Sequence, residues 1–241
     1  MKTADKNPLS DLDLHSFSVT GRRLFLSLLS LFEEGESTIY LNLGDIRALG
    51  VFADRHIKLQ MLIKAMDNFT RAAYGLFFHE AVPSNGVILI HNIRLFKEIA
   101  YEINDSRKFY PDHFQAFIEI DPEAMPLMKK LHEFISFELE DFHKLTRSYS
   151  QKLFIYLYPF KSTGTYKVSQ EELKRLLNIP ENYRQSEIDR KILKPVIEEL
   201  STSFPDLKYT KEKNDYDKRR VTGYVFTFKK SRSRKKKTAL K

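Results

Sequence analysis

Residues 168–200 read VSQEELKRLLNIPENYRQSEIDRKILKPVIEEL, and this stretch contains signals for the start and end of two consecutive helices. Ser169 is followed three residues later by Glu172, the spacing of a capping box, so we expect a helix to begin there. The Asn-Ile-Pro sequence that finishes at Pro180 ends this helix, because proline cannot continue it. A second helix is predicted over residues 186–200. Two short helices joined by a tight polar turn are typical of a helix-turn-helix.

The apolar face of the second predicted helix identifies its buried side. Its members recur at helical intervals, and they are Ile188, Ile192, Leu193, Val196, Ile197 and Leu200. Pro195 interrupts this helix, where its missing N–H costs about 3 kcal/mol or produces a kink. Because the apolar face continues in phase beyond Pro195, we expect one bent helix rather than two.

Segments on either side of the two helices complete a known arrangement. Residues 147–158 predict a helix that Pro159 ends, and residues 166–168 predict a short strand. Residues 207–213 and 221–228 predict two further strands joined by a polar turn. A helix, a strand, two helices and a two-stranded hairpin follow one another in the order of a winged helix.

The first half of the chain repeats this order. Residues 22–32 predict a helix, residues 39–43 a strand, and Asp45 is expected to cap a short helix that Gly50 closes. The next helix is predicted over residues 54–69. Its apolar face has the same intervals as the face that begins at Ile188, and it comprises Ile57, Met61, Leu62, Ala65, Met66 and Phe69. Four elements in the same order at a nearly constant offset predict two copies of one fold.

Further elements are predicted beyond residue 69. The sequence Ser84-Asn85-Gly86 favours a hairpin turn between strands at 76–78 and 87–90. Strands are also expected at 95–103 and 114–120, a helix at 122–131, and either a strand or a helix at 134–144.

The predicted fold class is α+β, with two tandem winged-helix (helix-turn-helix) domains related by pseudo-duplication. We place the N-terminal domain at residues 1–132 and the C-terminal domain at residues 146–230. Residues 133–145 are the expected linker, and residues 231–241 the expected disordered basic tail.

The positive charge is concentrated in the second half. Residues 1–142 carry 15 Lys and Arg against 21 Asp and Glu, a balance of −6, whereas residues 143–241 carry 25 against 11, a balance of +14. A separation of this size favours binding of a polyanion by the second half, over the alternative of a solvated face with a solubility tail.

Several other classes of protein fit the sequence poorly. The chain has no cysteine, which excludes disulfides, thiol catalysis and cysteine-ligated metal sites. No glycine precedes a lysine, so there is no P-loop, and no two of the seven histidines lie at a metal-binding spacing. No apolar stretch reaches the roughly 20 residues that span a bilayer. We therefore expect a cytoplasmic protein that is not an enzyme, uses no cofactor and contacts no membrane.

The second helix of a helix-turn-helix enters the major groove, so its exposed side supplies the candidate base contacts. These candidates are Arg184, Gln185, Ser186, Glu187, Arg190, Lys191 and Lys194. Arg190 has the side chain best suited to guanine, and Gln185 could pair with adenine. Glu187 could accept a hydrogen bond from cytosine or simply cap the helix, and the same two possibilities apply to Asp189.

Cations of the predicted wing and of the first domain form the second group of candidates. In the wing, phosphate or minor-groove contacts are expected from Lys211, Lys213, Lys218, Arg219 and Arg220. The corresponding helix of the first domain offers fewer cations, namely Arg55, Lys58 and Lys64. The basic run 229–237 is expected to add nonspecific phosphate contacts.

The second half also resembles a known family. Its matching segments are LTRSYSQKLFIYL (145–157), VSQEELKRLLNIPENY (168–183), IDRKILKPVIEEL (188–200) and RRVTGYVFTF (219–228). In these segments the chain resembles the C-terminal winged helix of the iteron-binding plasmid replication initiators, the Initiator Rep protein family. The first half fits more loosely, and Pro195 lies where the family has a proline of its own.

This resemblance implies a function. Members of the family bind repeated iterons in a plasmid origin as monomers, help to open an adjacent AT-rich segment, and bring in the host replication initiator and helicase. Many also form homodimers through the N-terminal domain and repress their own promoter. The resemblance implies no metal, nucleotide or catalytic residue. A winged-helix transcriptional repressor with no role in replication remains the first alternative, and a nicking enzyme the second.

Overall fold

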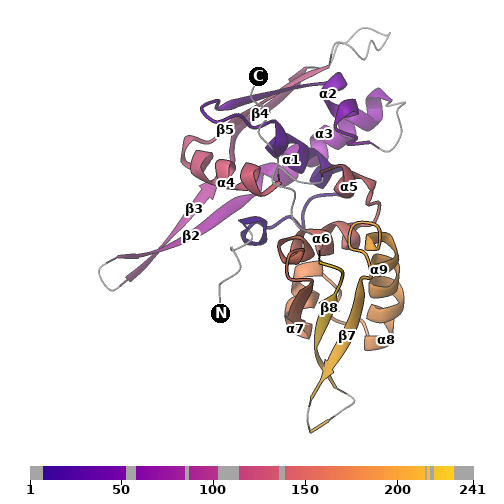
Figure 1. Cartoon of the computed structure of the whole chain (residues 1–241). Coiled ribbons are helices and arrows are strands. Elements are labelled where there is room, and N and C mark those ends of the chain that lie inside the picture. Colours follow the sequence, from indigo (N-terminus) through magenta and orange to yellow (C-terminus); the bar gives the residue numbers. More distant parts are fainter. Residues whose placement is uncertain are drawn as a thin grey trace. The chain divides into compact units, whose positions relative to one another are not determined.

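The protein is described by a computed structural model over residues 8–52, 58–84, 87–102, 114–135, 139–214, 216–217 and 220–230. Figure 1 shows its helices and strands, which divide into two units, Asn7–Lys144 and Leu145–Lys241. Both units bury apolar side chains in a core. Within the described ranges, no helix is both long enough and apolar enough to cross a membrane.

The second unit contains the predicted elements in the predicted order. Its helical segments are α6 (Ser148–Leu157), the 3-10 turn η4 (Tyr158–Phe160), α7 (Gln170–Leu177), α8 (Gln185–Glu187), the π-helical η5 (Ile188–Leu193) and α9 (Lys194–Leu200). Its strands are β6 (Thr165–Ser169), β7 (Lys208–Lys213) and β8 (Val221–Thr227). The strands form an antiparallel sheet in the order β6-β8-β7. We call β7, β8 and their connecting turn the wing.

Both ends of α7 follow from local chemistry. The hydroxyl of Ser169 accepts a hydrogen bond from the N–H of Glu172 at 3.1 Å, which confirms the predicted N-cap. The carboxylate of Glu172 accepts two hydrogen bonds from Arg175, at 2.9 and 2.6 Å, instead of the backbone bond that a capping box requires. At the other end, Asn178 adopts the left-handed conformation with φ 54°, which asparagine tolerates well.

Residues 185–200 form one continuous helix, which we call the recognition helix. It comprises α8, η5 and α9, and the N–H of Lys194 donates to the carbonyl of Asp189, five residues earlier. A π turn of this kind widens the helix just before Pro195, where an α-helical turn would set the proline ring against a carbonyl. The predicted apolar face is buried at Ile188, Ile192, Leu193, Val196 and Leu200.

The first unit has the same plan with added elements. Its helical segments are η1 (Pro8–Asp11), α1 (Val19–Leu31), α2 (Leu43–Ala48), α3 (Leu59–Tyr74), η3 (Pro122–Ala124), α4 (Met125–Ile135) and α5 (Leu139–Lys144). Its strands are β1 (Thr38–Asn42), β2 (Phe77–Ser84), β3 (Val87–Arg94), β4 (Phe96–Glu102) and β5 (Gln115–Ile120). They form an antiparallel sheet, β1-β5-β4, and a separate β2-β3 hairpin.

The two units are copies of one fold. In each, a helix precedes a strand, two helices follow, and two more strands complete a sheet whose order along the chain is first, third, second. Both units are therefore winged helices, as predicted. The β2-β3 hairpin lies between α3 and β4, where the second unit connects its helix directly to the wing, and Figure 1 shows it projecting from the rest of its unit.

Met61 is an error of the sequence prediction. It was assigned to the apolar face of the first unit's helix, but its side chain is 47% exposed, whereas the counterpart Ile192 is 1% exposed. The two helices share one spacing in sequence but differ in winding. Ile192 lies in the π turn, which adds a residue to the turn and rotates the following side chains, whereas α3 contains no such turn.

Two further boundaries differ from the prediction. The N-cap of α2 is Asn42, whose side chain accepts from the N–H of Asp45, while Asp45 completes a capping box by accepting from the N–H of Asn42. The helix α3 is described from Leu59 and continues to Tyr74, beyond the predicted end at residue 69. Residues 53–57, which contain the predicted start, lie outside the described residues.

The first unit also extends beyond its predicted end at residue 132. It includes the end of α4 and all of α5, so residues 133–144 are not the predicted linker. Phe142 of α5 is 1% exposed, and Nε2 of His143 lies 3.3 Å from the hydroxyl of Ser27 on α1. Burial of its imidazole, helped by the positive charge of Arg23, lowers the pKa of His143 to about 4.

Candidate nucleic-acid interface

The outer side of the recognition helix presents most of the predicted base-contacting residues to solvent. Arg184, Ser186, Arg190, Lys191 and Lys194 are exposed. Within the described part of the chain, the side chains of Arg190 and Lys194 form no hydrogen bond or ion pair. These two cations are therefore available for a partner, and they lie four residues apart, on the same side of the helix.

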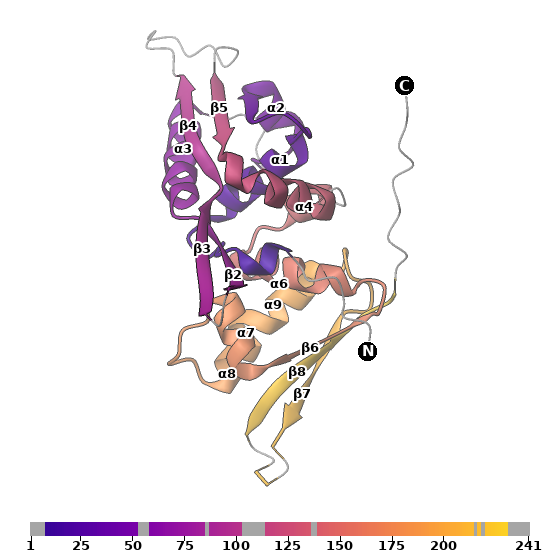
Figure 2. The same cartoon turned by 90° about the vertical axis from the view of Figure 1, so that its left-hand side faces the viewer.

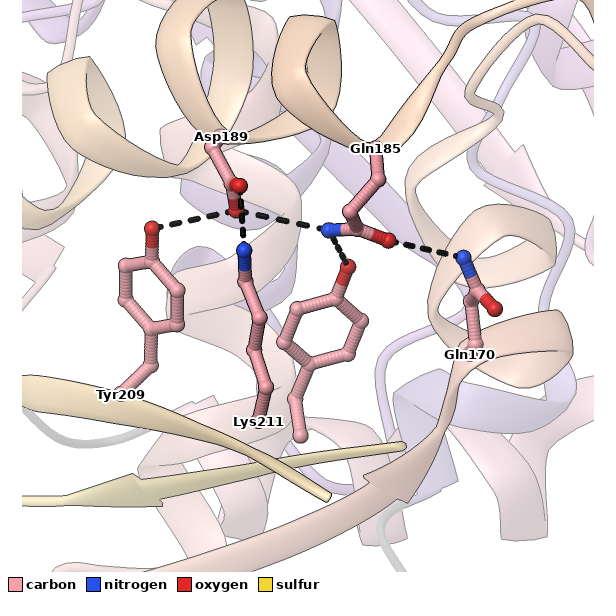
Figure 3. A network of polar contacts seen from close by, with 6 residues as sticks. Gln170, Gln185, Asp189, Tyr209 and Lys211 are labelled. Carbon is pink, nitrogen blue, oxygen red and sulfur yellow. Dashed lines mark hydrogen bonds and ion pairs between the residues drawn. The ribbon is translucent and has the colours of Figure 1, made fainter. Parts of the chain in front are cut away.

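Gln185, in contrast, is held inside the unit. Its Nε2 donates to the hydroxyl of Tyr224 at 2.6 Å and to Asp189 at 3.4 Å, and its Oε1 accepts from Nε2 of Gln170 at 3.0 Å. Figure 3 shows these contacts converging between the recognition helix, β8 and α7. The amide nitrogen and the amide oxygen of Gln185 both have hydrogen-bond partners within the unit. Gln185 therefore has a structural role in addition to the base contact predicted for it.

Lys211 belongs to the same polar network. Its ammonium group forms an ion pair with Asp189, which also accepts from the hydroxyl of Tyr209 at 3.2 Å (Figure 3). The side chains of Lys211 and Asp189 are only 27% and 18% exposed. Burial raises the pKa of Tyr209 to about 12, with a further contribution from the negative charge of Asp189. The network joins the recognition helix to the wing.

The two acids near the start of the recognition helix both have partners. Glu187 accepts from the N–H of Arg184 at 3.0 Å and from the ammonium group of Lys191 at 2.7 Å. The hydrogen bond from Lys191 is the main reason why the pKa of Glu187 lies below its ordinary value. Lys191 also lies 4.9 Å from the ring centroid of Tyr183. The carboxylate of Glu187 thus caps the start of the helix, which is one of the two roles predicted for it.

The wing presents cations near its tip. Figure 2 shows the β7-β8 hairpin reaching past α7 and α8. Lys213 and Arg220 are exposed close to its turn, while Lys218 and Arg219, also predicted to contact DNA, lie outside the described residues. The tail 231–241 lies outside them as well. Of the predicted wing cations, Lys213 and Arg220 therefore have a described, exposed position.

The outer face of α3 in the first unit has a similar character. Of the predicted residues, Lys58 and Lys64 are exposed, and Arg55 lies outside the described residues. The structure adds residues that the sequence reasoning missed, namely Gln60, Met61, Asn68 and Arg71. The acid on this helix, Asp67, accepts a hydrogen bond from the hydroxyl of Tyr101. A signal for Asn68 and Arg71 existed in the helical spacing, because they lie four and seven residues after Lys64.

A second exposed surface of the first unit is apolar. Four consecutive residues of β3 are exposed, Val87 by 58%, Ile88 by 70%, Leu89 by 47% and Ile90 by 67%. They lie in a two-stranded hairpin, β2-β3, in which, among the described residues, the outer edge of β3 has no neighbouring strand and that of β2 is bridged only at Phe78, by Leu12. An exposed apolar strand with a free edge is suited to pairing with another chain.

Comparison with known proteins matches both units to models of replication initiator proteins. The family model described as Initiator Replication protein, WH1, matches residues 3–158. The model described as Initiator Rep protein, WH2, matches residues 169–228. A "Probable replication protein rep" from Bifidobacterium longum (strain NCC 2705) is 31% identical over 142 residues, which are 53% of this chain and 46% of that protein. The chain thus matches about half the length of this relative.

Two solved structures share the fold at low sequence identity. One is described as the crystal structure of Pi initiator protein in complex with iteron DNA. It covers 90% of this chain and 92% of its own, with 14% identity and a TM-score of 0.60. The other contains domains 2 and 3 of RctB, covers 88% of this chain and 82% of its own, and has 14% identity and a TM-score of 0.52.

Proposed function

Because the chain belongs to the Initiator Rep protein family, we propose that it starts the replication of a plasmid by binding repeated sites, the iterons, in the plasmid origin. It binds these sites in the bacterial cytoplasm as a monomer and uses both winged helices. It then promotes the opening of an adjacent AT-rich region and recruits the host replication initiator and helicase. No step in this function requires a cofactor or a covalent intermediate.

The observation that carries the proposal is the arrangement of charge on the second unit. The recognition helix presents Arg190 and Lys194, which have no partner among the described residues, and the wing attached to it presents Lys213 and Arg220. A helix placed in a major groove can read bases with its exposed cations, while cations of a neighbouring hairpin contact the flanking phosphates. Support for iterons as the sites comes from the Pi initiator protein, a structural neighbour described in complex with iteron DNA.

Within this proposal, the DNA contacts divide into three groups. Arg190, Lys194 and the exposed face of α3 read bases, while Lys213 and Arg220 contact phosphates. Gln185 and Lys211 act as positioning residues, because their polar groups already join the recognition helix to the wing. Ser186 and Arg184 lie at the start of the helix, where backbone N–H groups favour phosphate.

We assign self-association to the first unit. The exposed apolar residues of β3 supply a surface that a second copy would cover, and the outer edge of β3, which has no neighbouring strand among the described residues, supplies backbone groups for pairing. In this dimeric form the protein represses its own promoter, and the monomer is the form that binds iterons.

The test is footprinting of the purified chain on the DNA that flanks its own gene, at two salt concentrations. Several evenly spaced protected sites of about two helical turns each, beside an AT-rich tract, are the expected result. A single inverted repeat over a promoter would instead identify a transcriptional repressor with no role in replication. Uniform protection that disappears at the higher salt would show that the chain binds only phosphate. Cleavage that requires a divalent metal would point to a nicking enzyme.

A further inference from the structure

The turn of the wing carries an aromatic side chain that is fully exposed. Tyr216 has an exposure of 101%, the highest among the large hydrophobic side chains in the described ranges. The aromatic residues Tyr224 and Phe226 of the neighbouring strand β8 are, in contrast, completely buried. A hairpin turn does not need an aromatic residue, since glycine, asparagine and aspartate suit its backbone better. The ring of Tyr216 is therefore free to contact a partner.

The backbone that carries Tyr216 is held in place. The side-chain oxygen of Asn214 accepts from the N–H groups of Tyr216, at 2.8 Å, and Asp217, at 3.2 Å. The N–H of Asn214 donates to the carbonyl of Arg220 at 3.0 Å, and the N–H of Arg220 donates to that of Asp217 at 2.9 Å. These bonds tie the backbone of Tyr216 and Asp217 to the ends of the two strands of the wing. A ring on a fixed backbone loses little conformational entropy when it is bound.

The charges around Tyr216 select the partner. Lys213, the last residue of β7, and Arg220, directly before β8, are exposed on the two sides of the turn, where the acid Asp217 follows Tyr216, and the wing is joined to the recognition helix through Asp189 and Lys211. A partner must therefore offer negative charge on either side of a surface on which an aromatic ring can pack. Duplex DNA has both, because its minor groove lies between two rows of phosphates. A wing beside a helix in the major groove lies next to that minor groove.

Building on the proposed function, we propose that Tyr216 enters the minor groove next to the recognition helix and packs its ring against a base step. Apolar side chains of architectural proteins use the minor groove in the same way and partly unstack the step. The phenolic hydroxyl can donate to the acceptor atoms that A·T pairs present there. Lys213 and Arg220 contact the phosphates on either side.

The chain contains no tryptophan, so Tyr216→Trp introduces a single fluorescent reporter at this position. We would titrate this variant with a fluorescein-labelled duplex taken from the DNA beside the gene, and with a mixed-sequence duplex of equal length. Label anisotropy measures binding, while tryptophan emission and its quenching by acrylamide measure contact at the turn. Thr227→Trp, at the opposite end of β8 and also exposed, is the matched control. We expect DNA to quench and protect the tryptophan at 216 but not the one at 227.

Affinity measurements provide a second test. Tyr216→Ala should weaken binding about five- to tenfold, equal to about 1 to 1.4 kcal/mol, and Tyr216→Phe should retain most of the affinity. Because no charge is removed, Tyr216→Ala should leave the dependence of log K on log salt unchanged. Arg220→Met should make that dependence less steep by about 0.9.

The possible outcomes separate this inference from the proposed function. Binding by anisotropy with unchanged emission at 216 would overturn the role of Tyr216 and leave the proposed function intact. Quenching with equal affinity for both duplexes would support the contact and refute specific origin binding. No binding to either duplex would overturn both. A change in emission that follows protein concentration without DNA would overturn the inference by identifying the wing tip as a protein contact.

Discussion

Replacing Lys211 with methionine distinguishes between two roles for this residue. The sequence places Lys211 among the cations of the wing and predicts a phosphate contact, whereas the structure pairs it with Asp189 inside its own unit. Methionine keeps much of the length of the side chain and removes its charge. The substitution therefore leaves the packing of the aliphatic part nearly intact and tests the ammonium group.

The cost of Lys211→Met can be estimated from the burial of the pair. Exposed ion pairs contribute about 0 to 1 kcal/mol, and loss of one partner of a fully buried pair costs about 3 to 5 kcal/mol. The side chains of Lys211 and Asp189 are 27% and 18% exposed, which lies between these cases. Asp189 also keeps the hydrogen bonds from Tyr209 and Gln185. We expect the free energy of unfolding to fall by about 2 kcal/mol.

Urea denaturation of the wild type, Lys211→Met, Asp189→Asn and the double variant would measure this cost and the coupling between the two residues. The double variant should lose about 1 to 2 kcal/mol less than the sum of the single losses, because each single variant already breaks the pair. Additive losses would contradict the ion pair.

DNA binding over a range of salt concentrations completes this test. Each phosphate contact contributes about 0.9 to the slope of log K against log salt. Lys211→Met should therefore leave the slope unchanged, while Lys213→Met, which removes an exposed wing cation assigned to a phosphate, should reduce the slope by about one contact. A reduced slope for Lys211→Met, with wild-type stability, would refute the internal role and restore the phosphate contact predicted from the sequence.

Three further predictions concern other parts of the chain. The pKa of His143 in the folded chain is about 4, below its ordinary value of 6.5, so the unfolded chain binds a proton at this imidazole more readily. The first unit should therefore lose about 2 to 3 kcal/mol of stability as pH falls from about 7 to 4. In a plot of the urea midpoint against pH, His143→Gln should flatten this part of the curve. Gly164 has φ +72°, and a Cβ there would lie 2.7 Å from the carbonyl oxygen of Phe228. Gly164→Ala should therefore lower the melting temperature by several degrees. An unchanged melting curve would show that this turn is arranged differently. Replacing Ile88 and Ile90 with lysine should shift the chain to the monomer in sedimentation experiments without altering its far-UV circular dichroism, because both side chains are exposed; a dimer that persists would place self-association on another surface.

The elements of the second unit were predictable because local signals bound each of them. Ser169 and Asn178 begin and end α7, as the sequence indicates, and Pro159 follows α6 closely. The exact winding of the recognition helix was not predictable. The apolar spacing around Pro195 fits both a kinked α-helix and a π turn, and only the packing of the helix against the rest of its unit distinguishes them.

Errors arose where tertiary contacts decide the structure. Met61 has the spacing of a core residue, but the absence of a π turn in α3 leaves it on the surface. The segment 134–144 was ambiguous because its apolar residues fit a strand or a helix, and its described residues are helical, at the end of α4 and in α5, where Phe142 packs into the first unit. The partners of Gln185 and Lys211 come from elements 15 to 39 residues away in sequence, so no local pattern announces them.

The acids of the recognition helix show why contacts between residues distant in sequence matter for DNA binding. Counted by sequence, Glu187 and Asp189 offset two of the cations around them and reduce the attraction of the helix for phosphate. In the structure each acid pairs with one specific cation, Glu187 with Lys191 and Asp189 with Lys211. Glu187 and Lys191 pair along the helix, four residues apart, whereas Asp189 pairs with Lys211 of β7. Since Glu187 also caps the backbone, its charge stabilises the helix end that the proposed function places at the DNA.

Arg190 and Lys194 consequently retain their full charge on the outer side of the helix, while the network around Asp189 holds the wing, with Lys213 and Arg220, at a defined angle to them. Removing Asp189 should therefore weaken binding even though it removes a negative charge from a DNA-binding surface. Simple electrostatics predicts the opposite sign for Asp189→Asn, a gain in affinity. A binding titration of this one variant at moderate salt distinguishes the two accounts, since a gain would show that the orientation of the wing contributes less than the charge of the carboxylate.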